Sequence, residues 1–159
     1  MTPEQFQSIF RSYLSPVSKY LARRVESSAV EDLASEVFAI AWQKRQAIPA
    51  EMELAWLYRT ARFVVSNHRK KTSVANKFLA SLMPVSAAPS AENLALAEIG
   101  LDAAWHSLSD SEREVLSLSV FEGIGIKEIS EVLRVSENTV NIRLSRARKK
   151  LLGYLKENN

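Results

Sequence analysis

The chain has 159 residues, of which 47% are hydrophobic and 25% charged, and its formal net charge is +3. That length accommodates one domain of ordinary size or two small ones. The sequence contains no cysteine and only two histidines, His68 and His106, which excludes disulfides, thiolate nucleophiles and cysteine-ligated zinc. Because no glycine-rich phosphate loop is present either, we expect no catalytic centre, no metal and no cofactor.

No apolar run approaches the roughly 20 residues that cross a bilayer, and the first residues are polar and acidic. Nothing in the sequence has the pattern of a secretion signal. We therefore expect a cytoplasmic protein with no segment inserted in a membrane.

The first part of the chain predicts three helices. Residues 2–5 form a capping box with proline at the first helical position, and Pro16 predicts a kink or a restart in the helix that follows. A second capping box, at residues 28–31, opens the next helix. A third helix is expected over about 53–71. Short connections between these helices predict a compact helical domain over residues 1–72.

Residues 73–100 have a different composition and are expected to form a linker. Residues 74–82 favour a short helix. Residues 84–90 are small, uncharged and interrupted by two prolines, a composition typical of a flexible, semi-extended tether. We therefore place a domain boundary between residues 72 and 101.

The last part of the chain predicts a second helical domain, over residues 101–159. A helix is expected from about Ser90 to Ser107, and a capping box at residues 109–112 opens the next one. Two further helices are expected over residues 126–133 and from Glu137 to about Leu155. The chain is thus predicted to be all-α, with two small helical domains joined by a flexible linker.

Basic residues gather in two places. One cluster lies within residues 59–71, and the other lies within residues 137–156, where six bases accompany the single acid Glu137. Two separated positive patches fit two contacts with one polyanion. From charge alone, two solvated helix faces remain the alternative.

The last two predicted helices have the pattern of a helix-turn-helix. A short helix is followed by the three-residue turn Arg134 to Ser136, with Ser136 placed as the N-cap of a longer basic helix. In this motif the second helix enters the DNA major groove by its N-terminal part. An ordinary amphipathic helix with a solvated basic face is the alternative.

The faces of this second helix separate at 100° per residue. Val140, Leu144, Ala147 and Leu151 share one arc and are expected to pack inward. Asparagine and arginine can read base edges, and isoleucine can contact a thymine methyl. The residues expected to contact DNA, with Arg143 and Arg148 at the sides for phosphates, are Asn138, Thr139, Asn141, Ile142, Arg143, Ser145, Arg146, Arg148 and Lys149.

Four segments of the chain carry recognisable motifs. Residues 31–42 read EDLASEVFAIAW, and residues 55–62 read AWLYRTAR. Residues 108–116 read LSDSEREVL, and residues 122–148 hold the predicted helix-turn-helix. In this order they resemble the segments EDLxQEVFxxAW, AWLYRIAR, LPxxEREVL and EGLSxxEIAEVLGVSxGTVKSRLxRAR of the small, two-domain, extracytoplasmic-function (ECF) type of bacterial RNA polymerase sigma factor. The ordered set of motifs is far more specific than any one of them.

The resemblance implies that the first domain binds core RNA polymerase and the promoter's minus-ten element, and that the second reads the minus-thirty-five element. The residues it implies for polymerase binding are Asp32, Leu33, Glu36 and Phe38. Those it implies for the minus-ten element and strand opening are Trp56, Tyr58, Arg59, Arg62, Asn67, Arg69 and Lys70. A helix-capping role for Asp32 and burial in the core for Trp56 are open alternatives, and His68 is expected to be packed.

The sequence also departs from the family pattern. Arg134 occupies the usual glycine of the helix-turn-helix turn and is expected to adopt a positive φ. Gly125 replaces the usual serine cap, a tolerable exchange. Residues 138–142 replace the common GTVKS with NTVNI, so the minus-thirty-five sequence cannot be borrowed from relatives. The loop 46–53 lacks the family's frequent aromatic and Ser/Thr pattern.

We therefore expect a sigma factor that directs promoter-specific initiation, contacts double-stranded and melted DNA, and is monomeric when free. It is not expected to be an enzyme, because the polymerase supplies the catalysis, and an anti-sigma factor is a candidate partner. The alternatives are a stand-alone helix-turn-helix regulator that binds as a dimer, and an adaptor that never contacts DNA.

Overall fold

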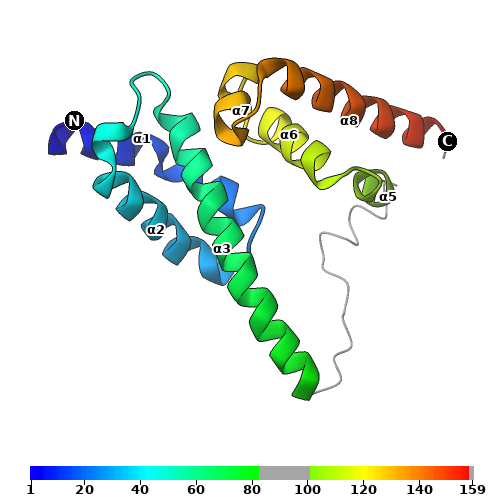
Figure 1. The fold of residues 1–159 in the computed structure, drawn as a ribbon, viewed down its shortest axis with the longest axis horizontal. Helices are drawn as coiled ribbons and strands as arrows, with labels where there is room; N and C mark the ends of the chain where they lie inside the picture. Colours follow the sequence, from blue (N-terminus) through cyan, green and yellow to red (C-terminus); the bar gives the residue numbers. More distant parts are fainter. Residues whose placement is uncertain (83–100, 158–159) are drawn as a thin grey trace. The chain divides into compact units, whose positions relative to one another are not determined.

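The computed structural model describes residues 1–82 and 101–157 (Figure 1). These residues form two compact units, with residues 1–82 making up the first and most of residues 101–157 making up the second. Every regular element in the described ranges is a helix. The prediction of an all-α protein with two helical parts is therefore confirmed.

The first unit consists of three helices that contact one another in all three pairings. They are α1 (Pro3–Ala22), α2 (Val30–Gln43) and α3 (Glu53–Leu82), with short 3₁₀ turns at Ser27–Ala29 and Arg45–Ala47 between them. Burying one apolar stripe from each helix supplies the main stabilisation of such a unit. The side chains that are most completely buried in it are Val17, Tyr20, Leu21, Val37, Ala41, Leu57, Ala61 and Val64.

Aromatic pairs join the helices of this unit. Phe10 of α1 meets Phe38 of α2 edge to face, with ring centroids 5.0 Å apart. Tyr20 of α1 lies 5.3 Å from Tyr58 of α3 in a tilted arrangement. Such pairs add to area burial because the edge of one ring is attracted to the face of the other. They fix the positions of both α2 and α3 against α1.

The first predicted helix start is confirmed and the second is wrong. The Thr2 hydroxyl accepts from the Gln5 N–H at 3.1 Å, and the Gln5 amide oxygen accepts from the Thr2 N–H at 2.8 Å. By contrast, Ser28 lies within the 3₁₀ turn, and the cap position of α2 is Ala29, which makes no side-chain cap bond. The 3₁₀ turn has taken up the residues that the capping pattern assigned to the cap.

Neither the restart predicted at Pro16 nor the helix end predicted near residue 71 is present. α1 continues through Pro16, where proline removes one backbone bond to Ser12; Ser12 is exposed, so water can satisfy its carbonyl. α3 does not end near residue 71 but runs as one helix to Leu82. The physical reason is that no glycine or proline lies between Pro49 and Pro84, so nothing in the sequence stops the helix.

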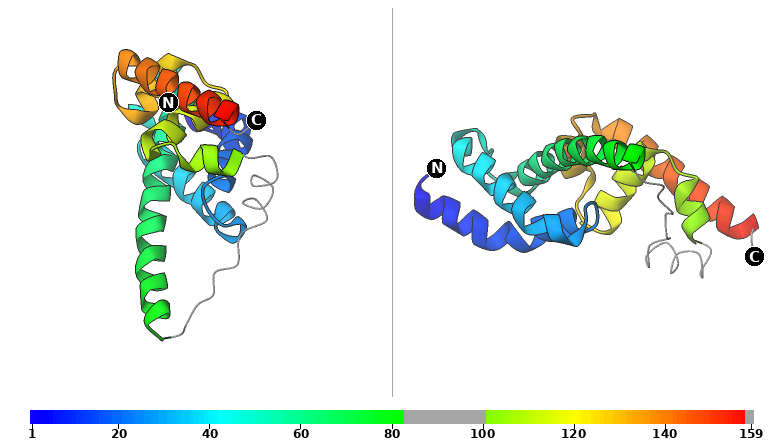
Figure 2. Two further views of the ribbon diagram at one scale, coloured as in Figure 1. Left: turned by 90° about the vertical axis from the view of Figure 1, so that its right-hand side faces the viewer. Right: turned by 90° about the horizontal axis from the view of Figure 1, so that it is seen from below.

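The second half of α3 extends beyond α1 and α2 (Figure 2). Where it leaves them, two polar contacts tie it to the α1–α2 connection: His68 Nε2 lies 2.9 Å from Glu26 Oε1, and the Arg69 guanidinium donates to the Arg24 carbonyl at 3.3 Å. The backbone N–H of Glu26, and then the His68 side chain, lower the pKa of the Glu26 carboxyl. His68 was expected to be packed; it is instead a partly exposed partner of a carboxylate.

The second unit comprises α5 (Leu101–His106), α6 (Asp110–Val120), α7 (Ile126–Leu133) and α8 (Glu137–Glu157). The predicted start of its first helix at Ser90 lies outside the described residues. The capping box at the start of α6 is confirmed, with the Ser109 hydroxyl accepting from the Glu112 N–H at 3.2 Å. The most completely buried side chains of this unit are Ala104, Val115, Leu118, Ile129, Val132, Val140 and Ala147.

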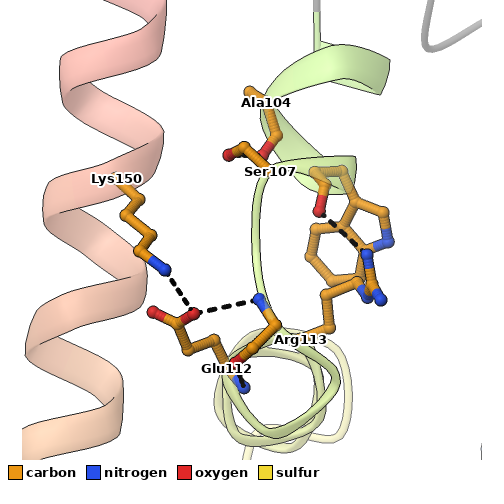
Figure 3. A network of polar contacts seen from close by, with 7 residues as sticks. Ala104, Ser107, Glu112, Arg113 and Lys150 are labelled. Carbon is orange, nitrogen blue, oxygen red and sulfur yellow. Dashed lines mark hydrogen bonds and ion pairs between the residues drawn. The ribbon is translucent and has the colours of Figure 1, made fainter.

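One carboxylate joins α6 to α8 (Figure 3). Glu112 Oε1 accepts from the Ser109 N–H at 2.9 Å and from Lys150 Nζ at 2.7 Å, while Oε2 is buried without a partner. The Lys150 ammonium and then the Ser109 backbone N–H lower the pKa of Glu112 to about 2. The carboxylate is thus held in its charged form by Ser109, three residues before it, and by Lys150 on α8.

This pair predicts the acid sensitivity of the second unit. Because the folded-state pKa is lowered from 4.5 to about 2, the stabilisation is complete above about pH 4.5 and is lost as pH falls toward 2. Over that pH range the unfolding free energy of the wild type should fall by up to about 3 kcal/mol more than that of Glu112→Gln, which has no carboxylate to protonate. Urea unfolding followed by circular dichroism at several pH values measures it; parallel curves for the two proteins would contradict the assignment.

A second variant tests the same pair from the other side. Lys150→Met leaves the buried carboxylate without its cation, so we expect a loss of about 1–3 kcal/mol at pH 7. The matched control is Lys149→Met, one residue earlier, whose ammonium makes no ion pair with any described residue and whose replacement should change stability by less than about 0.5 kcal/mol.

Candidate nucleic-acid and polymerase interfaces

α7, a three-residue turn and α8 form the predicted helix-turn-helix. The turn is Arg134 to Ser136, and the Ser136 hydroxyl accepts from the Thr139 N–H at 3.1 Å, as expected of an N-cap. Arg134 adopts φ 56° and ψ 45°, the left-handed conformation predicted for it. Its N–H donates to the Ser130 carbonyl, which closes the end of α7.

The two faces of α8 differ in burial as the helical wheel predicts. Val140, Leu144 and Ala147 are buried, and Leu151 is half-buried. The opposite face is open to solvent, and Ile142 is 43% exposed on it. The exposed members of the predicted DNA-contacting set are Asn138, Asn141, Ile142, Ser145, Arg146, Arg148 and Lys149, while Thr139 and Arg143 are half-buried.

A hollow of about 530 Å³ adjoins this face, between α8 and the first turn of α7. Its lining includes the apolar side chains of Ile129 and Leu144. Asn141, Ser145 and Arg148 also line it, so some of the residues predicted to contact DNA lie on a concave surface.

Lys150 belongs to the basic cluster within residues 137–156, but its ammonium is engaged by Glu112. This role could not be found from the spacing within α8, because the partner lies 38 residues earlier in the sequence. Of the neighbouring lysines, Lys149 therefore remains the one available to a ligand.

A second basic surface follows one face of α3. At 100° per residue, Arg59, Arg62, Arg69 and Lys70 fall within an arc of about 100°, and they are exposed or half-buried. Glu53 is the only acid in α3. Asn67 lies at the margin of this surface and is half-buried.

The two aromatic side chains assigned to strand opening are buried. Tyr58 is 2% exposed, with its ring against Tyr20, and Trp56 is 8% exposed. In this structure neither ring is accessible to a DNA strand. The core role that the sequence left open for Trp56 applies to both residues. Sequence reasoning overlooked Phe63, which is 59% exposed on α3; a wheel of the whole helix places it beside the bases.

The acidic residues predicted to bind polymerase are both on the surface. Asp32 and Glu36 are exposed one turn apart on α2, where residues i and i+4 share a face. Leu33 and Phe38, predicted to join them, are buried at 7% and 5% exposure. Both belong to the core of the first unit, which leaves Asp32 and Glu36 as the candidate contact.

Within residues 1–82 and 101–157, no group of acidic or histidine side chains could hold a metal ion. In the same ranges, no helix is both long and apolar enough to span a bilayer.

Comparison with known families decides between the readings that the sequence left open. The family description "Sigma-70 region 2" matches residues 9–74, and "Sigma-70, region 4" matches residues 100–151. The chain belongs to the sigma-70 family of RNA polymerase sigma factors. Region 2 followed by region 4 is the make-up of the ECF type. The first matched region contains α2 and the basic face of α3, and the second contains the helix-turn-helix.

Individual relatives agree with this assignment. The sigma factor is 27% identical to the RNA polymerase sigma factor SigZ of Bacillus subtilis (strain 168) over 154 residues, which cover 94% of this chain and 86% of SigZ. The stand-alone regulator is therefore not favoured, because the similarity spans both units.

Solved structures show the same fold. The sigma factor RpoE in complex with the anti-sigma factor NepR, from Bartonella quintana, matches with a TM-score of 0.70 and 21% identity, over 96% of this chain and 98% of that one. CnrH in complex with the cytosolic domain of CnrY matches with a TM-score of 0.67 and 21% identity, over 99% and 92%.

The left-handed residue in the turn yields a stability prediction. A side chain at Arg134 costs about 1 kcal/mol in this conformation, so we expect Arg134→Gly to raise the unfolding free energy of the second unit by about 0.5–1 kcal/mol. Lys149→Gly, in the interior of α8, should lower it by about 1 kcal/mol. Urea unfolding compares the two, and destabilisation by both substitutions would show that the Arg134 side chain contributes more than its backbone costs.

Proposed function

We propose that Asp32 and Glu36 form the docking pair for core RNA polymerase. What supports this is their shared exposure on one face of α2, at the positions that match the family's acidic polymerase-binding segment. Exposed carboxylates close together attract a basic partner surface and set its register. The neighbouring apolar residues of α2 act indirectly, by holding the helix against α1 and α3.

We further propose a division of the promoter between the two units. Residues 1–72, extended by the remainder of α3, bind the polymerase and the minus-ten region, and residues 101–159 read the minus-thirty-five element through α8. The observation that carries this proposal is the presence in one chain of an acidic docking helix and two helices with open basic faces.

Within α8, Asn138, Asn141, Ile142 and Arg146 are proposed to contact base edges. Arg143, Arg148 and Lys149 are proposed to hold phosphates beside them. On α3, Arg59, Arg62, Arg69 and Lys70 are proposed to hold the backbone of the melted strand, where charge sets affinity.

We propose that the free protein is a cytoplasmic monomer without catalytic activity of its own. Sigma factors regulate initiation while the polymerase performs the chemistry. Since RpoE and CnrH were solved with NepR and with CnrY, we also propose that this chain has an anti-sigma partner that competes for the polymerase- and DNA-binding surfaces.

Run-off transcription with purified core polymerase tests the proposal as a whole. DNA selected by the reconstituted holoenzyme from a random library supplies the promoter. The expected result is a product that depends on both the sigma factor and that promoter. A chain that fails to bind core, or that yields no promoter-dependent product, would refute the proposed function.

The docking pair can be tested alongside a variant that controls for the loss of charge near the start of α2. Asp32→Asn combined with Glu36→Gln removes both charges and should weaken core binding about tenfold or more. Glu31→Gln is the matched control, because Glu31 is exposed in the same first turn and its loss affects the dipole similarly. Affinity is measured by fluorescence anisotropy with labelled sigma factor; equal losses in both variants would mean that the pair is not specific.

The reading face can be separated from the phosphate contacts. We expect Arg146→Ala to cost about 1–3 kcal/mol on the selected promoter and much less on unrelated duplex. Arg148→Ala should weaken binding to both and lower the salt slope by about 1. Holoenzyme binding is titrated at several salt concentrations, and a uniform loss for Arg146→Ala would assign it to phosphate.

A further inference from the structure

The second half of α3 carries apolar side chains that no other helix of the first unit covers. Val74 is 70% exposed, Phe78 65% and Leu79 53%. Residues 73–79 are all exposed, and the helix here extends beyond α1 and α2 (Figure 2). Because large apolar side chains are usually buried, three of them in close succession indicate a surface that contacts something else.

These side chains continue the apolar stripe by which α3 packs in the first unit. At 100° per residue, Val74, Phe78 and Leu79 fall within an arc of about 140°. The buried side chains of Leu57 and Val64 fall within the same arc. The helix therefore keeps one apolar face along its length, and α1 and α2 cover only the first part of that face.

The same part of α3 is positively charged. Lys70 and Lys77 lie within about 60° of Val74 around the helix axis, beside the apolar arc, and Lys71 lies where the arc leaves the first unit. No acid occurs in α3 after Glu53, and none of the three lysines forms an ion pair with a residue of the described ranges. A ligand for this surface must therefore combine negative charge with apolar groups.

An anionic lipid bilayer meets this requirement better than other ligands do. DNA would match the lysines but would leave the apolar face in water, and a second copy of the chain would bring like charges together. An acidic protein helix would match both properties, but a single helix that is exposed on all sides offers it no groove. A bilayer presents phosphates and acyl chains in one surface and requires no complementary shape.

We propose that the second half of α3 is an interfacial helix that binds anionic phospholipid bilayers. It lies along the bilayer surface and not across it, because its apolar residues occupy one face only. Phe78 and Leu79 enter the boundary between headgroups and acyl chains, while the flexible lysine side chains keep their ammonium groups at the lipid phosphates. The inference concerns the free chain and does not depend on the proposed function.

Flotation of the full-length chain with lipid vesicles tests the inference. We expect the chain to float with vesicles of equal parts phosphatidylglycerol and phosphatidylcholine, and to bind pure phosphatidylcholine vesicles at least about tenfold more weakly. Val74→Ser combined with Phe78→Ser should weaken binding to the mixed vesicles about tenfold or more, because the apolar face is lost. The matched control makes the same two substitutions at Val120 and Phe121, which are exposed in the second unit, and should stay within twofold of the wild type.

The contribution of charge has a matched pair of its own. Lys77→Gln should weaken binding about fivefold, since each cation close to an anionic surface contributes on that order. Lys127→Gln removes the same charge from an exposed position of α7 and should leave binding within twofold of the wild type.

The absence of cysteine from the chain allows insertion to be measured at single positions. Phe78→Cys and Asn76→Cys, each labelled with the environment-sensitive fluorophore NBD, place the probe on faces of α3 about 160° apart. On the mixed vesicles we expect a blue shift and brighter emission from the label at position 78, and neither from the label at position 76.

The inference is wrong if the chain binds both kinds of vesicle equally or binds neither, since the acidic protein helix would then be the better ligand. Equal losses in the two double variants, or in the two lysine variants, would also contradict it. Equal spectral changes at positions 76 and 78 would show attraction to the surface without an inserted face. Because the vesicle experiments contain neither polymerase nor promoter, failure of the proposed function would leave their outcome unchanged.

Discussion

The first unit depends on the continuity of α3. With no glycine or proline between Pro49 and Pro84, one helix supplies both the buried stripe that packs on α1 and α2 and the basic face that is proposed to bind DNA. These two faces are related only by helical periodicity, so a change in the packing of Leu57 or Val64 would rotate Arg59 and Lys70 with it. Core packing and ligand contact are thus two properties of the same rigid element.

The second unit uses α8 in a comparable way. Its inner arc consists of the buried side chains Val140, Leu144 and Ala147, and its outer arc is exposed to solvent. The sharp turn before it requires Arg134 to adopt a left-handed conformation, which other chains avoid by using glycine. The motif therefore forms here because burial of Ile129, Val132 and Val140 in the core of the unit outweighs a local backbone cost.

Local patterns predicted local structure well. The caps at Thr2, Ser109 and Ser136 each depend on residues within three positions, and all three were found from sequence. The prediction at Ser28 failed because the residues around it form a 3₁₀ turn, which occupies the positions that the cap would have needed. The periodicity of α8 also sufficed, since its apolar residues fall on a single arc.

Long-range relations could not be read in this way. α3 carries aromatic residues on more than one face, and only the positions of α1 and α2 decide that Tyr58 is buried while Phe63 is open. Likewise Lys149 and Lys150 are equivalent in sequence, and a carboxylate 38 residues away distinguishes them. Sequence reasoning therefore found the helices that bear the candidate sites more reliably than the individual side chains that are free to bind.

The bond between Glu112 and Lys150 bears on how promoters are told apart. The same carboxylate closes the first turn of α6 and holds the middle of α8. A change in the crossing angle of these two helices would strip a buried charge of its counter-ion. We therefore expect α6 and α8 to keep their crossing angle when region 4 binds DNA. Discrimination among promoter sequences would then depend on the side chains exposed on α8 and on how readily each duplex deforms to fit.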